Sequence, residues 1–216
     1  MSFHVPTRPW AAALAGLLLA APAADAQARG LPLFFDPTFS FDTRAGGDIG
    51  NGGELGGFVW SLGATHLFLV GNCRKLAVSA AGGLWHPSGE DSDGFNGGAT
   101  VSYLVNPCPE FTSQPNPTVR LVGGGGLTRA PGRTVWNAPL GAQIGYMLPI
   151  AAARIEPWAT LRAHWLESPV SDDRSTWRVG LSLGLNVGLG ATFGLRGAAD
   201  FGTGRTGFGG GLSYWW

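Results

Sequence analysis

The sequence predicts an all-β fold, a transmembrane, antiparallel, up-and-down β-barrel of ten strands. Three observations lead to this prediction. Only 13% of the 216 residues are charged, against a usual share of about 25%. Glycine accounts for 36 of the 216 residues, more than twice the usual share of about 7%. Large apolar residues recur at every second position, yet beyond the N-terminal leader no apolar run reaches the roughly 20 residues of a membrane-spanning helix. A closed sheet is then the structure that can cross a membrane.

The first element is a cleavable export signal over residues 1–26. Arg8 precedes an apolar run from Trp10 to Ala21, and Ala24-Asp25-Ala26 forms an A-x-A cleavage site. The run is too short to span a bilayer as a helix. Cleavage removes one basic and one acidic residue and leaves a chain without net charge, which gives no indication of nucleic-acid binding. We expect residues 27–37 to form an N-terminal periplasmic segment and residues 38–216 to form the barrel.

The clearest strand is residues 177–189, WRVGLSLGLNVGL. Large apolar residues alternate there with polar residues and glycine, a period of two rather than 3.6. In a membrane barrel the apolar face meets lipid and the small polar face meets the lumen. Nine other ranges carry the pattern in chain order, the first three of them weakly: 38–45, 55–68, 75–85, 95–105, 119–128, 136–148, 155–166, 192–201 and 206–216.

The number of strands depends on one break. Alternation is continuous over residues 177–201, but at about 3.3 Å per residue this run exceeds a tilted barrel strand of about 9–11 residues. A turn at residues 188–191 therefore divides it. Ten strands place both termini on the periplasmic side, and eight is the fallback if the two weakest N-terminal strands do not form.

The connections agree with this topology. The extracellular loops are expected near residues 46–54, 86–94, 129–135, 167–176 and 202–205, and the periplasmic turns near 69–74, 106–118, 149–154 and 188–191. Cys73 and Cys108 then lie in two turns at the same end of the barrel. Because exported proteins meet an oxidising compartment, we favour a disulfide between them over two unpaired thiols.

Several charged residues are expected on the inward face, in the middle of a glycine-rich lumen. A structural interpretation is a network of ion pairs and hydrogen bonds that holds the barrel's shape, and the alternative is an anion-preferring constriction. We favour the structural one because a barrel this narrow is nearly filled by side chains. The predicted polar network comprises Arg120, Glu156, Arg162, His164, Arg178, Arg196 and Asp200.

Catalytic and metal sites receive little support from the sequence. His164 faces the lumen near Asp172-Asp173 in the following loop, but no nucleophile is placed beside it. The acidic stretch 89–98 lacks the ligand spacing of an EF-hand, and the glycines at 123–126 interrupt a strand without the lysine of a phosphate-binding loop. We therefore expect no catalytic residue, no cofactor and no metal.

The chain resembles the small bacterial outer-membrane barrels of the OmpA/OmpX/OmpW type. The resemblance rests on the export signal, the alternating strands and the terminal pattern Phe208-x-Gly210-x-Leu212-x-Tyr214-x-Trp216. This pattern looks like the signal by which the barrel assembly machinery takes up its substrates, with Trp in place of the usual terminal Phe. It implies an outer-membrane location, with lipid, lipopolysaccharide and the assembly machinery as partners.

The expected function is that of a monomeric, non-enzymatic outer-membrane protein, either structural or a passive pore for small solutes with an Arg-rich lumen. Four arginines against two acids in the inward set favour anions if the lumen conducts. The alternative is a barrel hydrolase that acts on lipid or peptide at the extracellular rim.

Overall fold

The computed structural model describes residues 43–51, 57–71, 73–88, 91–105, 117–130, 133–150, 153–167, 175–190, 192–202 and 207–216. The predicted export signal and periplasmic segment lie outside these residues. The strands are β1 (Arg44–Asn51), β2 (Phe58–Val70), β3 (Cys73–His86), β4 (Gly94–Leu104), β5 (Pro117–Ala130), β6 (Arg133–Tyr146), β7 (Leu148–Ile150), β8 (Ala153–Glu167), β9 (Ser175–Leu189), β10 (Phe193–Gly202) and β11 (Gly207–Trp215). Among the described residues, no helix is long and apolar enough to cross a membrane.

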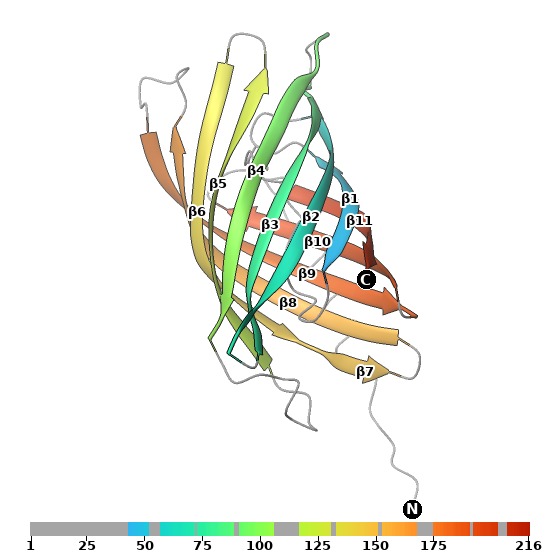
Figure 1. Cartoon of the computed structure of the whole chain (residues 1–216). Coiled ribbons are helices and arrows are strands. Elements are labelled where there is room, and N and C mark those ends of the chain that lie inside the picture. The colour runs from blue at the N-terminus through green and yellow to red at the C-terminus, as the bar shows by residue number, and fades with distance from the viewer. Residues whose placement is uncertain are drawn as a thin grey trace, which may run out of the picture.

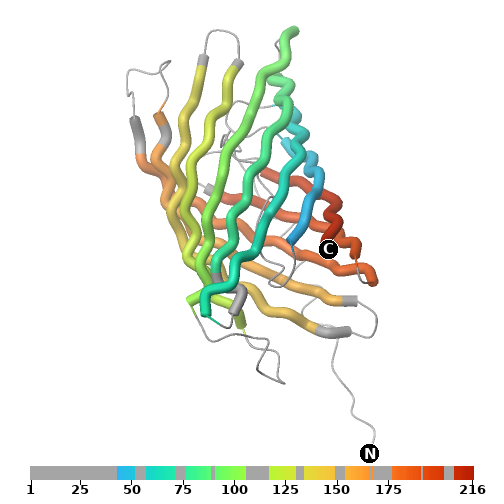
Figure 2. Tube along the Cα trace, in the orientation of Figure 1, coloured from blue at the N-terminus to red at the C-terminus, as the bar shows by residue number. Residues whose placement is uncertain are grey.

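The strands form one antiparallel sheet that closes on itself. Apart from β6 and β7, strands that follow each other in the sequence are paired in the sheet, β1 pairs with β11, and β6 pairs with β8. Figure 1 shows the tilted strands, and Figure 2 shows β1 in blue beside the red C-terminal strand. Closure leaves no sheet edge with unpaired backbone groups. The predicted up-and-down barrel is confirmed.

The eleven strands correspond to ten segments that run from one end of the barrel to the other, because β7 continues the line of β6. Gly145 on β6 pairs with Trp158, and Leu148 on β7 pairs with Ile155, in one unbroken register along β8. Pro157 lies between these two β8 residues and has no amide hydrogen to donate, which interrupts the ladder locally. The predicted strand over 136–148 thus corresponds to β6 and the start of β7.

Two boundaries test the sequence predictions. The break within 177–201 is confirmed: β9 ends at Leu189, and Gly190 has a positive φ of 68° in the turn before β10. The first strand is displaced, because β1 covers Arg44–Asn51 instead of 38–45, and residues 38–42 lie outside the described part. The predicted loop at 46–54 is therefore wrong over most of its length. Pairing with β2 on one side and β11 on the other holds this glycine-rich stretch extended.

The wall has two chemically different faces. Leu62, Leu140 and Trp177 point outward and are 62%, 66% and 67% exposed. Inside, twenty polar or charged residues and only nine apolar ones are buried among the described residues. A soluble domain has the reverse distribution, so the chain folds as a membrane barrel, with an apolar face for lipid and a polar interior.

The outward face is itself layered. Aliphatic residues such as Leu140, Leu161 and Leu183 occupy its middle. The exposed aromatic residues gather near the strand ends: Tyr103, Tyr146, Phe193, Tyr214 and Trp216 at the end that holds the C-terminus, and Phe58, Trp60, Phe95, Trp136, Trp177 and Phe208 at the opposite end. Two aromatic girdles around an aliphatic belt are the pattern of a barrel that spans a bilayer. We call the two ends of the barrel the C-terminal end and the loop end.

Candidate functional site

The inner face of the barrel carries the polar groups that a function would use. The side chains of Arg44, Arg120, Glu156 and His164 point inward and are at most 1% exposed. Alternation along each strand places them there, since every outward neighbour is apolar or small. The interior therefore combines charged side chains with Ser, Thr, Asn and Gln side chains, and the barrel wall buries them.

One ion pair crosses the strand that closes the barrel. Arg196 on β10 and Asp48 on β1 are separated by β11, and both are paired with the same β11 residue, Gly211. Arg196 Nη2 donates to Asp48 Oδ1 at 2.6 Å, and both side chains are almost fully buried. A Cβ on Gly211 would collide with this Asp48 oxygen. The missing side chain of Gly211 thus leaves the space in which the pair forms.

A second ion pair crosses β9 in the same way. Arg162 on β8 lies 3.2 Å from Asp200 on β10, measured between Nη2 and Oδ1. Ser182 on β9 lies between them: its hydroxyl donates to Asp200 Oδ1 at 2.6 Å and accepts from Arg162 Nη2. The two pairs together connect five successive strands, β8, β9, β10, β11 and β1. They stabilise the part of the wall in which the first strand, β1, pairs with the last strand, β11.

A third polar group lies near the C-terminal end of the interior. Asn186 Nδ2 donates to Glu156 Oε2 at 3.5 Å. A Cβ on Gly145 would stand 3.0 Å from Glu156 Oε1 and 3.1 Å from the Thr118 hydroxyl. Glu156 therefore leans over Gly145 toward β5.

Three tryptophan rings fill much of the remaining space. Trp85, Trp158 and Trp215 point inward, and each is at most 6% exposed. The ring of Trp158 covers Gly184, and the ring of Trp215 covers Gly194, so that a Cβ at either glycine would overlap the ring. The inward glycines are thus covered by side chains from neighbouring strands rather than lining an open bore.

The predicted inward residues all lie on the inner face. Arg120, Glu156, His164, Arg196 and Asp200 are buried, whereas Arg162 and Arg178 are partly exposed. The structure joins Arg162 to Asp200. It also brings His164 Nδ1 to 3.4 Å from Asn137 Oδ1. Asp172 and Asp173, considered as partners of His164, lie outside the described residues.

Sequence reasoning missed Asp48, the partner of Arg196, because the stretch around it was assigned to a loop. Arg44 and Asp48 are four residues apart on one face of β1, separated there only by Gly46. A polar or glycine residue at every second position, from Arg44 through Gly46 to Asp48, is the pattern that could have identified β1.

Two histidines lie outside the interior. His66 is exposed on the outer face of β2, with Nδ1 2.9 Å from the Thr43 hydroxyl. His86 ends β3 at the loop end, where its Nδ1 lies 2.7 Å from Asp93 Oδ1 in an exposed pair. Among the described residues, no three His, Cys, Asp or Glu side chains are grouped to hold a metal ion.

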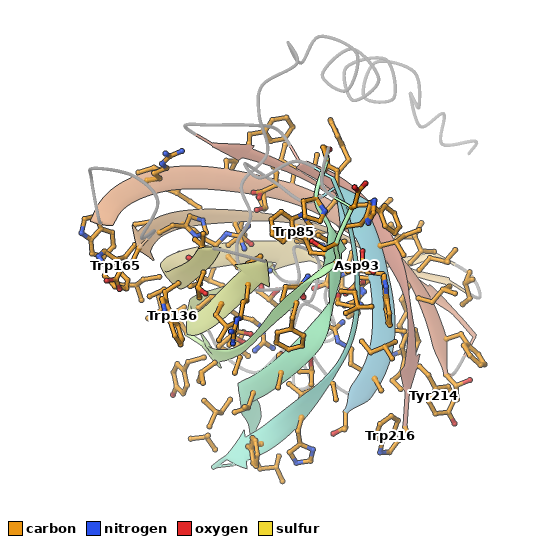
Figure 3. The ribbon with its side chains drawn as sticks, turned by 90° about the horizontal axis from the view of Figure 1, so that it is seen from above. Trp85, Asp93, Trp136, Trp165, Tyr214 and Trp216 are labelled. Carbon is orange, nitrogen blue, oxygen red and sulfur yellow. The ribbon has the colours of Figure 1, made fainter. Side chains whose placement is uncertain are left out.

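The predicted assembly signal forms an outward aromatic surface on β11 and the residue after it. Phe208, Leu212, Tyr214 and Trp216 are all exposed there. The rings of Tyr214 and Trp216 stack with centroids 5.9 Å apart. Trp216 also donates its backbone N–H to the carbonyl of Thr43 at 3.1 Å. Figure 3 shows Tyr214 and Trp216 on the outside of the wall, away from the inward Trp85.

The predicted disulfide is not tested by the described residues. Cys73 begins β3, paired with Val70 across a tight turn, and so is part of a strand rather than of the turn itself. Cys108 lies outside the described residues. The bond between them stays a prediction.

Solved structures that resemble the chain include the β domain of the Bordetella autotransporter BrkA, at 13% identity and a TM-score of 0.45, over 81% of this chain and 99% of that one. The KdgM porin, solved in complex with disordered oligogalacturonate, matches at 10% identity and 0.39, over 81% and 98%. A loop-deletion mutant of OmpT, an outer membrane protein of Vibrio cholerae, matches at 13% and 0.32, over 76% and 55%. No family model and no curated protein matches the chain. Likeness at this level carries no argument about a ligand.

Proposed function

We propose that this chain is a non-enzymatic, integral protein of the bacterial outer membrane whose barrel is structural and closed to solutes. The observation that carries the proposal is the pairing of an apolar outer face with a polar interior that is almost inaccessible to water. The loop end would face the exterior and the C-terminal end the periplasm, as in outer-membrane barrels with an even number of strands.

The dry interior distinguishes a structural barrel from a pore. An open channel would leave its inward side chains accessible to a water-sized sphere. Instead, Arg120, Thr160, His164 and Asn186, which come from three different strands, are at most 1% exposed. Such a packed interior is expected in a narrow barrel. Arg162, which is 13% exposed, is among the few inward charges that keep some contact with solvent.

A hydrolase would need a nucleophile and a base that substrate can reach. His164 is fully buried, and its Nδ1 lies 3.4 Å from the side-chain amide oxygen of Asn137. This environment supports a space-filling role for His164 rather than a catalytic one.

The resemblance to barrels of the OmpA/OmpX/OmpW type belongs to the same proposal. It is supported by the filled interior and by the aromatic residues at the end of β11. The cleaved signal over residues 1–26 and recognition of Phe208, Leu212, Tyr214 and Trp216 by the assembly machinery complete the proposed route to the outer membrane.

Planar-bilayer recording tests the closed barrel. The folded chain, inserted at a density at which an added general porin gives clear steps, is expected to give no stepwise current. Current steps whose size changes in Arg162→Ala or Arg196→Ala would refute the closed structural barrel and support an anion-preferring pore. Cleavage of a lipid or peptide that disappears in His164→Ala and persists in the two Arg variants would replace it by an enzyme.

A further inference from the structure

A groove of about 650 Å³ lies on the outer wall and is lined by residues of β3, β4, β5, β6 and β8. Its floor is formed where outward positions carry glycine or alanine, at Gly97, Gly125 and Ala138. Large apolar side chains such as Leu121 and Leu140 occupy outward positions further along the same strands. The groove is therefore a local hollow in the apolar belt.

Aromatic rings form the sides of this groove. Phe95 covers one side, with its ring carbons 3.0 Å from where a Cβ of Gly97 would stand. Trp136 and Trp165 form the other side together with Leu127. Figure 3 shows Trp136 and Trp165 near each other at the left of the barrel, across from Tyr214 and Trp216. Because the lining is almost wholly apolar, it fits a hydrocarbon chain.

One end of the groove carries charged residues, and the other end is apolar. Arg129, exposed on the outer face of β5, is paired with Phe95 at the loop end. Glu167, the last residue of β8, lines the same end and is paired with Trp136. Gly125 lies four residues deeper than Arg129, about 13 Å along the strand. The groove thus runs from a cation and a carboxylate at the membrane surface into the apolar belt.

We propose that this groove holds one acyl chain of a phosphorylated glycolipid in the outer leaflet. The lipid's phosphate would contact the Arg129 guanidinium, which binds phosphate oxygens strongly, and a sugar hydroxyl would donate to Glu167. The polar-to-apolar gradient matches an amphiphile better than a second barrel, which would present apolar surface along the whole groove. This inference rests on the proposed function, because it requires the barrel to span a membrane with its loop end outward.

Native mass spectrometry of the full-length, detergent-purified barrel with added bisphosphorylated lipid A tests the proposal. Wild type is expected to retain one lipid A molecule per barrel. Gly125→Leu fills the groove and should weaken this binding about tenfold, equivalent to about 1.4 kcal/mol. Arg129→Gln should weaken binding of lipid A by a similar factor and leave binding of its dephosphorylated form unchanged.

Gly197→Leu is the matched control. Gly197 also points outward, on β10, away from the groove, and its nearest neighbour to an added Cβ is the carbonyl oxygen of Gly209 at 4.0 Å. Gly125 has the same freedom, with the Asn137 carbonyl oxygen at 3.9 Å. Both positions thus have room for an added Cβ on the lipid face, and Gly197→Leu should bind lipid A as wild type does.

The outcomes separate the two proposals. Equal retention of lipid A by Gly125→Leu and Gly197→Leu, in a barrel that still needs detergent, would overturn the lipid site alone. A wild-type particle of two barrels that becomes single in Gly125→Leu would overturn it in favour of a second copy of the chain. A wild-type chain that stays folded and monomeric in plain buffer would overturn the membrane function itself.

Discussion

Asp48 and Arg196 form a buried ion pair beside the seam at which the barrel closes. Their side chains meet across β11 at a position where Gly211 provides no side chain. Each charge is buried, so each has lost its hydration and depends on its neighbours inside the wall. Removing one member leaves the other as a buried charge without this partner, and such a loss is costly.

Asp48→Ala is expected to lower the free energy of unfolding by about 3 kcal/mol. Denaturant titration of the barrel in lipid vesicles measures this value. Asp93→Ala is the control, because Asp93 pairs with His86 on the exposed surface, where such a pair contributes at most about 1 kcal/mol. Equal losses in the two variants would contradict a special role for the interior pair.

The two cysteines give a second prediction at the residue scale. A disulfide between Cys73 and Cys108 would close a loop of about 35 residues and stabilise the barrel by about 3–4 kcal/mol in the chain-entropy model. Mass spectrometry of the exported, unreduced protein should find the mass of two fewer hydrogens than the reduced form. Alkylation of both thiols without prior reduction would refute the bond.

At the scale of single strands, the prediction from sequence succeeds where large side chains alternate. Residues 177–189 carry seven large apolar residues on one face, and they form β9 almost to the residue. The alternation of large apolar side chains does not predict strand β1, because Ile49 is its only large apolar residue. Its extended form comes from pairing with β2 and with β11, and β11 is distant in sequence, so no apolar pattern within β1 predicts it.

The turn between β9 and β10 allows a test at the element scale. Gly190 adopts a φ of 68°, and an added Cβ there would meet no atom within 4 Å. Gly190→Ala therefore reports the backbone conformation alone and should lower stability by about 1 kcal/mol. Gly197→Ala, at an open position within β10, is the control and should change stability by less. An equal effect of the two substitutions, measured by denaturant titration, would contradict a left-handed turn at Gly190.

At the scale of the whole molecule, the sequence predicts which face of each strand points inward but not what meets inside. Arg162, Arg196 and Asp200 are assigned to the lumen by alternation alone. Their partners follow from strand order and register, which bring Ser182 to Asp200 and Asp48 to Arg196. The groove near Gly125 cannot be predicted from the sequence either, because its lining residues come from five strands.

The central claim is that the outer face of the wall meets lipid while the inner face meets neither lipid nor water. Spin labels placed singly at residues 181, 182, 183, 185 and 186 of β9, with both cysteines replaced by serine, test it most directly by their collision rates with oxygen and with a water-soluble nickel chelate. We predict that the Leu181, Leu183 and Leu185 positions are reached by oxygen but not by the chelate, and that the Ser182 and Asn186 positions are reached by neither. Chelate contact at the inward positions would contradict a closed interior, and chelate contact at the leucine positions would contradict the membrane barrel.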